Sequence, residues 1–301
     1  MLSYTGRRTR FGQLANNTQT GTLTIADALM NDATRMLLGL AEWDFLEKTK
    51  TTTSTASTQF YDLPSDCGKL ISVTYTNGNI YTPMECTSRD HWNALNMTSQ
   101  TSDTPEWFYI FNGQVGFYPT PSSSSKTITF IYQRSFKDLS IADYTTGTIT
   151  TATTGSSSIV GSGSSWTDKM EGRYLKITDS DTANTGDGFW YEIEDVDTGT
   201  TMTLTRLYAG PSIAAGSAAY TIGQMAPLPE DYQTLPVYKA LEIYFSSIQP
   251  EPDRAKIYRD MFDNGLADMK RRHGSKSTSP VIDAGYGKEM VNPNNYPSSI
   301  G

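Results

Sequence analysis

The hydrophobic pattern changes its period twice along this chain of 301 residues, and that change restricts the fold more than any other feature. Apolar residues recur at helical spacing from Ile25 to Trp43 and again from Val237 to Met269. Between these two stretches they alternate with polar residues, as in strands with one buried face. Because both helical stretches must bury an apolar face, we expect them to pack together into a bundle core beside a β segment. The predicted class is α+β.

The first helical stretch is expected to begin at Thr24, whose hydroxyl can cap a helix. Its apolar residues form one broad stripe, which we expect to be buried against other helices: Ile25, Leu29, Met36, Leu40 and Trp43, with Ala26, Met30, Ala33 and Leu37 beside them. Residues 1–23 are polar and basic, and we expect them to form a flexible N-terminal arm. Arg7, Arg8 and Arg10 in this arm could contact DNA or an acidic protein surface.

Two Asn-Gly pairs predict tight hairpins in the β segment. Asn77-Gly78 lies between expected strands at 70–76 and 80–82, and Asn112-Gly113 between strands at 107–111 and 114–118. Near residue 138 the composition becomes rich in Thr, Gly and Ser, with alternating runs at 174–178, 189–196 and 202–207. Short strands at this spacing indicate a small β-barrel or sandwich.

The expected organisation is therefore a core of residues 24–138 and 223–273, interrupted by an inserted β-rich module of residues 139–222. Residues 274–301 follow the last helix with no period, and we expect an extended C-terminal tail that needs a partner to order it. Spaced apolar residues in this tail are the expected anchors: Val281, Ile282, Tyr286, Met290, Val291, Tyr296 and Ile300.

The charge and the cysteine count exclude some protein classes. A formal charge of −8 argues against a coat that binds DNA by neutralising phosphates. No apolar run approaches the ~20 residues that span a bilayer, and no signal peptide is visible, so we expect a protein made in a host cytoplasm without a membrane partner. Cys67 and Cys86 are expected to be free thiols.

The residues needed for catalysis are sparse, and no enzyme activity or cofactor is expected. His91 and His273 are the only histidines, and neither occurs in a metal-ligand spacing. Asp179, Asp181 and Asp187 form an oxygen-rich loop that could hold Ca²⁺, although it lacks the EF-hand order of ligands. Glu192 and Glu194 alternate with apolar residues, which is typical of a solvated strand face.

Four short motifs together resemble the head-to-tail adaptors of tailed phages, also called head-completion, neck or tail-tubular proteins. They are the aromatic helix end Trp43-Asp-Phe45-Leu46, the stop Tyr61-Asp-Leu63-Pro64, the pair Pro105-Glu-Trp107 and Gly116-Phe-Tyr118-Pro119, and a second Leu228-Pro229 before the last helices. The resemblance spans roughly residues 24–271 and is weakest over 139–222.

The resemblance implies a structural virion protein that forms a ring of about twelve copies beneath the portal. It implies a C-terminal tail bound to the portal protein, a platform for tail or nozzle proteins, and passage of double-stranded DNA without sequence specificity. Asp179, Asp181, Glu192 and Glu194 are then expected to repel DNA from the channel wall. The alternative is a carbohydrate- or receptor-binding module of a phage tail, built on the aromatic strands and the inserted module.

Overall fold

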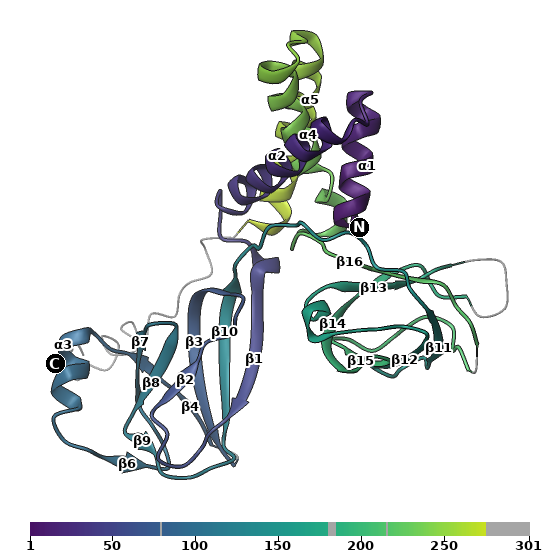
Figure 1. Cartoon of the computed structure of the whole chain (residues 1–301). Helices are drawn as coiled ribbons and strands as arrows, with labels where there is room; N and C mark the ends of the chain where they lie inside the picture. Colours follow the sequence, from purple (N-terminus) through teal and green to yellow (C-terminus); the bar gives the residue numbers. More distant parts are fainter. Residues whose placement is uncertain (79, 180–184, 215, 275–301) are drawn as a thin grey trace, which may run out of the picture.

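The computed structural model describes residues 1–78, 80–179, 185–214 and 216–274, which form three lobes around a common junction (Figure 1). The helical lobe contains the helices from both ends of the described chain. Two further lobes, here called the β lobe and the β module, lie on the same side of the helical lobe (Figure 1) and contact each other near the junction. The α+β class is confirmed, with N- and C-terminal helices packed together.

The helical lobe is built around one buried helix. Its helices are α1 (Tyr4–Ala15), α2 (Thr20–Leu38), α4 (Leu235–Ile243) and α5 (Pro252–His273). Helix α4 packs against α1, α2 and α5, and Val237, Ala240 and Leu241 on it are fully buried. A wide turn at Tyr244–Ile248 follows α4 and places Phe245 in the same core.

The expected flexible arm is wrong, because most of residues 1–23 are helical. Ser3 caps α1 by accepting a hydrogen bond from the amide of Gly6 at 3.1 Å, and Asn16 ends it in the left-handed conformation. Phe11 is fully buried against α4 and lies edge-on to Tyr244. Few apolar residues mark this helix in the sequence, yet those few are enough to hold it in place because α4 supplies the other half of the contact.

Helix α2 begins four residues earlier than expected and buries only part of its apolar stripe. Thr24 lies inside the helix, where its hydroxyl donates to the carbonyl of Thr20. The buried residues are Ala26, Met30, Ala33, Thr34 and Leu37. Ile25, Met36 and Leu40, which were expected to share this burial, are exposed.

The β lobe is a sandwich of two four-stranded sheets. Its strands are β1 (Glu47–Thr53), β2 (Phe60–Asp62), β3 (Cys67–Asn77), β4 (Ile80–Pro83), β5 (Glu85–Cys86), β6 (Thr101–Ser102), β7 (Trp107–Phe111), β8 (Gln114–Tyr118), β9 (Thr120–Pro121) and β10 (Thr127–Arg134). One sheet has the order β1-β10-β3-β4 and the other β2-β8-β7-β5, with β6 and β9 paired separately.

Both expected hairpins are confirmed, because β3 pairs with β4 and β7 with β8. Gly78 and Gly113 both have positive φ, as tight hairpin turns require. Aromatic rings fill the space between the two sheets, among them Tyr75, Phe117 and Phe130. Helix α3 (Arg89–Leu95), capped by Ser88, lies against the second sheet and stacks Trp92 on Tyr109.

The β module is one curled sheet of six strands in the order β11-β12-β15-β14-β13-β16. The strands are β11 (Thr148–Ala152), β12 (Ser158–Ser162), β13 (Tyr174–Ile177), β14 (Trp190–Thr198), β15 (Thr201–Leu204) and β16 (Tyr220–Gly223). Backbone bridges join the two ends of the sheet, at Ile149 with Ala218 and at Ala152 with Ile213. The sheet therefore curls around its own core, as expected for a small barrel.

Candidate functional site

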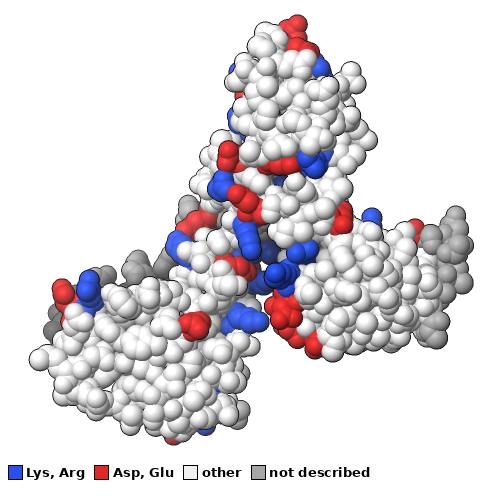
Figure 2. Space-filling model, viewed as in Figure 1, with Lys and Arg blue, Asp and Glu red and all other residues white. Residues whose placement is uncertain are grey.

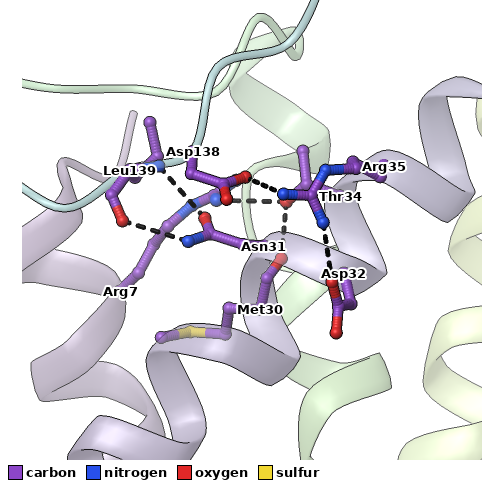
Figure 3. A network of polar contacts seen from close by, with 8 residues as sticks. All are labelled: Arg7, Met30, Asn31, Asp32, Thr34, Arg35, Asp138 and Leu139. Carbon is purple, nitrogen blue, oxygen red and sulfur yellow. Dashed lines mark hydrogen bonds and ion pairs between the residues drawn. The ribbon is translucent and has the colours of Figure 1, made fainter.

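The segment that leaves the β lobe, at Asp138 and Leu139, runs along helix α2 and is bound to it by polar contacts (Figure 3). Asn31 of α2 pairs with the backbone of Leu139 in both directions, its amide donating at 3.1 Å and its carbonyl accepting at 3.2 Å. One residue earlier, Asp138 forms an ion pair with Arg35, which also contacts Asp32 at 2.7 Å. These contacts fix the direction in which the chain crosses to the β module.

The first residues of α1 hold the next part of the same crossing. The hydroxyl of Ser3 donates to Asp143 at 2.7 Å, and the amide of Asp143 donates to the hydroxyl of Thr5 at 3.1 Å. The returning chain is held at the same place, because the amide of Tyr4 donates to the carbonyl of Gln224 at 2.8 Å. Helix α1 therefore contacts both chain segments that connect the β module, and it fixes the place of that module.

A charged cleft of about 510 Å³ lies where the β lobe meets the β module. Figure 2 shows Lys, Arg, Asp and Glu side chains gathered around this junction, while the visible faces of the β lobe and of the β module are largely uncharged. The charged residues lining the cleft come from both sides: Lys48, Lys50, Asp66, Arg134 and Lys137 from the β lobe and its outgoing chain, and Lys169, Glu171, Arg173, Glu192 and Glu194 from the β module.

Glu192 is the centre of the charge network in this cleft. Its carboxylate lies 2.8 Å from the ammonium of Lys48 and 3.7 Å from the guanidinium of Arg134. Lys48 is also 3.6 Å from Asp66, which accepts a hydrogen bond from Tyr132 at 2.7 Å. Burial and this hydrogen bond raise the pKa of Tyr132, so the phenol remains a donor across the ordinary pH range.

The charge network joins the two β-rich parts of the chain and has no arrangement suited to catalysis. Each carboxylate in it is neutralised by a cation, and no nucleophile with an adjacent base lies among its members. His91 contacts Thr87 at 2.8 Å, and His273 contacts Asp44 at 3.1 Å. Both histidines therefore have partners outside the charge network. Within the described ranges, no group of three His, Cys, Asp or Glu side chains could hold a metal.

Cys67 and Cys86 are free thiols, and burial raises the pKa of both. A raised pKa leaves little thiolate at neutral pH, which makes a thiol a weak nucleophile. Neither cysteine therefore resembles a reactive centre.

The three arginines expected to contact DNA or a partner occupy different environments. Arg7 is buried inside the helical lobe, where one guanidinium nitrogen donates to Thr34 at 3.3 Å, and burial lowers the pKa of this group to about 10. Arg8 lies 3.3 Å from Asp27 of α2. Of the three, Arg10 alone is exposed without an ion pair in the described part of the chain. Arg7 is thus unable to reach a partner from this position.

The acidic residues expected to line a channel are not gathered into one patch. Glu192 is paired in the cleft, whereas Glu194 lines the same cleft, is exposed and forms no ion pair with any described residue. Asp179 is exposed just beyond the end of β13. Tyr174 of β13 pairs with Glu192, and Asp179 follows Tyr174 by five residues, so roughly 16 Å of extended chain separates Asp179 from Glu192. Asp181 lies outside the described residues.

Of the calcium candidates in the described chain, Asp187 already accepts hydrogen bonds from residues that follow it in the chain. It accepts from the hydroxyl of Tyr191 at 2.5 Å and from the amide of Phe189 at 3.1 Å. The expected portal anchors from Val281 to Ile300 all lie outside the described residues. The aromatic strands proposed as a sugar platform are largely core, since Phe108, Phe117 and Tyr118 are buried.

The contacts of α1 and α2 with the connecting segments and the ion pairs in the cleft hold the β module in place beside the other two lobes. The family model described as SU10 adaptor protein matches residues 4–153. The chain belongs to this family of phage head-to-tail adaptors, which are structural rather than catalytic. No curated protein matches the chain. No helix in the described part of the chain has the length and apolarity needed to cross a bilayer.

The sequence analysis missed the residues that hold the lobes together. Ser3, Asn31 and Asp143 are short polar residues without a motif, and their partners lie more than a hundred residues away. In the sequence, Lys48 and Glu192 each look like a solvent-exposed residue of a strand. Their ion pair could not be foreseen, because the two residues are distant in the sequence. Before residue 20, the local signals of a helix were Ser3 as a cap and the helical spacing of Phe11, Leu14 and Ala15.

Proposed function

We propose that this adaptor forms a ring of about twelve copies beneath the portal of a tailed phage, in the virion neck. There it extends the DNA channel and provides the platform to which tail or nozzle proteins attach. The observation that carries the proposal is the family match over residues 4–153, which covers α1, α2 and the whole β lobe. In this role the helical lobe supplies the ring, and both β-rich lobes lie on one side of it (Figure 1).

We further propose that residues 24–138 and 223–273, now joined by α1, act as the adaptor core, and that residues 139–222 are an insertion. The hydrogen bonds of α1 and α2 to the segments that enter and leave the β module support this division. They hold the module at its two connections, so that it can be added without changing the packing of α2 on α4. The tail of residues 274–301 binds the portal through Val281, Ile282, Tyr286, Met290, Val291, Tyr296 and Ile300. Gly274, where the described chain ends, forms a backbone bridge with Trp43.

The experiment that tests the ring combines native mass spectrometry and negative-stain microscopy of the purified chain, alone and mixed with portal rings. We expect a closed ring of many copies, either free or only on the portal. A chain that stays monomeric and ignores the portal would overturn the proposal. Binding of that monomer to a glycan array would instead favour the receptor-binding alternative.

Deletion of residues 275–301 tests the tail separately. We expect the truncated chain to unfold at the same temperature as the full chain and to lose portal binding. Substitution of Tyr286 and Tyr296 by Ser in the full chain is the finer version, since it removes two anchors and keeps the tail length. Undiminished portal binding by both variants would reject the tail as the portal contact.

Neutralising the exposed acids tests the channel role. Asp179→Asn with Glu194→Gln should slow DNA ejection from assembled particles, because uncharged side chains no longer repel phosphate. The matched control is Asp187→Asn, whose carboxylate is engaged by Tyr191. Ejection at the normal rate in the double variant would place these acids outside the channel.

A further inference from the structure

The cleft between the β lobe and the β module holds more cations than its own acids neutralise. The acids of the charge network are each paired with a cation of that network. Two further acids line the cleft, Glu171 and Glu194, and neither forms an ion pair with a described residue. Four further cations line it that are likewise unpaired within the described ranges, namely Lys50, Lys137, Lys169 and Arg173. This local excess is opposite in sign to the charge of −8 on the whole chain.

Arg173 is the buried member of these four cations. It is 9 % exposed and lines the cleft, and its side chain forms no hydrogen bond or ion pair with any described residue. Its backbone is held on both sides, because its amide donates to the carbonyl of Met170 at 3.0 Å and its carbonyl accepts from the amide of Ile193 at 2.8 Å. Burial lowers the pKa of the guanidinium, as expected for a cation without a counter-charge. Its N–H donors are therefore available to an anion that enters the cleft.

The open edge of strand β1 forms one wall of the same cleft. β1 is the outermost strand of its sheet, with β10 on one side and no described strand on the other. It is the strand of the β lobe nearest the β module (Figure 1), and Lys48, Thr49 and Lys50 line the cleft. The backbone of residues 48–53 forms no hydrogen bond to any described segment other than β10. Alternate residues of β1 therefore present unpaired N–H and C=O groups, with which another extended strand can pair.

A protein segment with acidic side chains fits these features better than a nucleic acid does. Glu171 and Glu194 would repel a run of phosphates. A protein strand can instead place single carboxylates beside the cations, where a guanidinium binds a carboxylate through two parallel hydrogen bonds. A second copy of β1 fits poorly, because pairing the two edges would bring Lys48 and Lys50 of one copy beside those of the other.

We propose that the cleft binds an extended acidic segment of another virion protein, which adds as a strand to the open edge of β1. The backbone of this segment pairs with residues 48–53, and its carboxylates bind Arg173, Lys50 and Lys169. Main-chain hydrogen bonds supply affinity in this mode of recognition, and the cations select an acidic strand. The inference rests on the proposed attachment platform and deepens it, since it names the surface and the chemistry of the partner.

A model peptide tests this chemistry on the purified full chain. The probe is a labelled, blocked peptide of alternating Thr and Glu, and the same peptide with Gln in place of Glu is its control. Fluorescence anisotropy should show saturable binding of the Glu peptide that weakens as salt is added, because salt screens the ion pairs. The Gln peptide should bind at least about tenfold more weakly. Equal binding of the two peptides, or tighter binding of a short single-stranded oligonucleotide, overturns the proposal.

Substitutions in the cleft test the site itself. Arg173→Gln should weaken binding of the Glu peptide at least about tenfold. The double variant Lys50→Gln with Lys169→Gln should have the same effect at two exposed positions, and it decides the matter if Arg173→Gln does not fold. Arg10→Gln is the matched control, because Arg10 is exposed, forms no ion pair with a described residue and does not line the cleft. Thermal unfolding confirms which variants fold, and unchanged peptide binding in the double variant overturns the proposal.

N-methylated peptides test the strand addition separately from the charge. One Glu peptide is methylated on the amides of its Thr residues and another on the amides of its Glu residues. An added strand turns only alternate amides toward β1, so we expect one of the two peptides to lose binding and the other to keep it. Loss of binding in both peptides or in neither overturns the strand addition.

A photo-crosslinking residue in place of Thr49, in assembled particles, identifies the occupant. We expect a link to an acidic segment of another virion protein. A link to residues 275–301 or to a second copy of this chain overturns the proposal. Particles in which the Lys50 and Lys169 double variant still forms the ring and attaches the tail reject this cleft and leave the proposed function intact. A chain that forms no ring on the portal overturns the proposed function, whatever the peptides do.

Discussion

Lys48 on β1 and Glu192 on β14 lie 2.8 Å apart, although 144 positions separate them in the sequence. Each belongs to a different β-rich part of the chain, so their ion pair ties the β lobe to the β module. Arg134 and Asp66 extend the pair into a network of four charges. Such a network is more persistent than an isolated surface pair, which contributes about 0–1 kcal/mol.

Breaking this network should loosen the β module while leaving each lobe folded. Glu192→Gln removes the acid that neutralises Lys48 and Arg134, and the two cations then repel each other. We expect a larger radius of gyration in small-angle X-ray scattering, with unfolding free energy lowered by about 1 kcal/mol or less. Glu194→Gln is the control, because Glu194 is exposed on the same strand. Equal scattering from both variants would show that the contacts of α1 and α2 with the connecting segments hold the module without the ion pairs.

Arg7 should destabilise the folded chain rather than stabilise it. Its guanidinium is buried with one hydrogen bond, to Thr34, and two of its nitrogens have none from any described residue. Arg7→Met keeps the volume and removes the buried charge, so we expect the unfolding free energy to rise by about 1 kcal/mol. Arg7→Ala instead leaves a cavity and should lower it by about 2 kcal/mol. Urea unfolding distinguishes the two, and a large loss in Arg7→Met would mean that the charge has a partner.

Alanine substitutions at two glycines of the β module should distinguish the cost of backbone strain from the cost of a steric clash. Gly147 and Gly155 both have positive φ, at 87° and 81°. A Cβ at Gly155 meets open space, whereas a Cβ at Gly147 would lie 2.6 Å from the carbonyl oxygen of Ser162. We expect Gly155→Ala to cost about 1 kcal/mol and Gly147→Ala about 3 kcal/mol or more in unfolding free energy. Equal costs would show that the backbone at Ser162 can yield.

Two tyrosines of the β module should make it sensitive to alkaline pH. Burial raises the pKa of Tyr208 and of Tyr220 to about 12, against 10 for an exposed phenol. The folded state therefore holds these protons more tightly than the unfolded state does. Their contribution to stability is complete below pH 10 and is lost as the pH rises through about 12.

Thermal unfolding between pH 8 and pH 12 measures this loss. Tyr220→Phe should flatten the profile and lower stability at neutral pH, because the hydroxyl accepts from Trp166 at 2.8 Å. Tyr238→Phe is a control on α4, where the hydroxyl makes no hydrogen bond to any described residue. An identical profile in the Tyr220 variant would assign the alkaline transition to other groups.

The strands and helices with strong local signals were predictable. Asn77-Gly78 and Asn112-Gly113 each mark a hairpin, because few other residues adopt positive φ at such turns. Pro252 and the basic end at Arg272 bound α5 closely. In the β module, β11 and β12 were missed because Thr, Ser and Gly provide little alternation to read.

The sequence by itself determined where the helical and strand periods lie, since those periods follow from the spacing of apolar residues along a local backbone. It did not determine which side of α2 is buried, because Ile25 and Ala26 both continue an apolar row. The tertiary structure decided this: small residues at Ala26 and Ala33 let α2 approach α4 closely, and the larger Ile25 and Met36 were left outside. The same packing of distant segments formed α1 and brought Lys48 to Glu192.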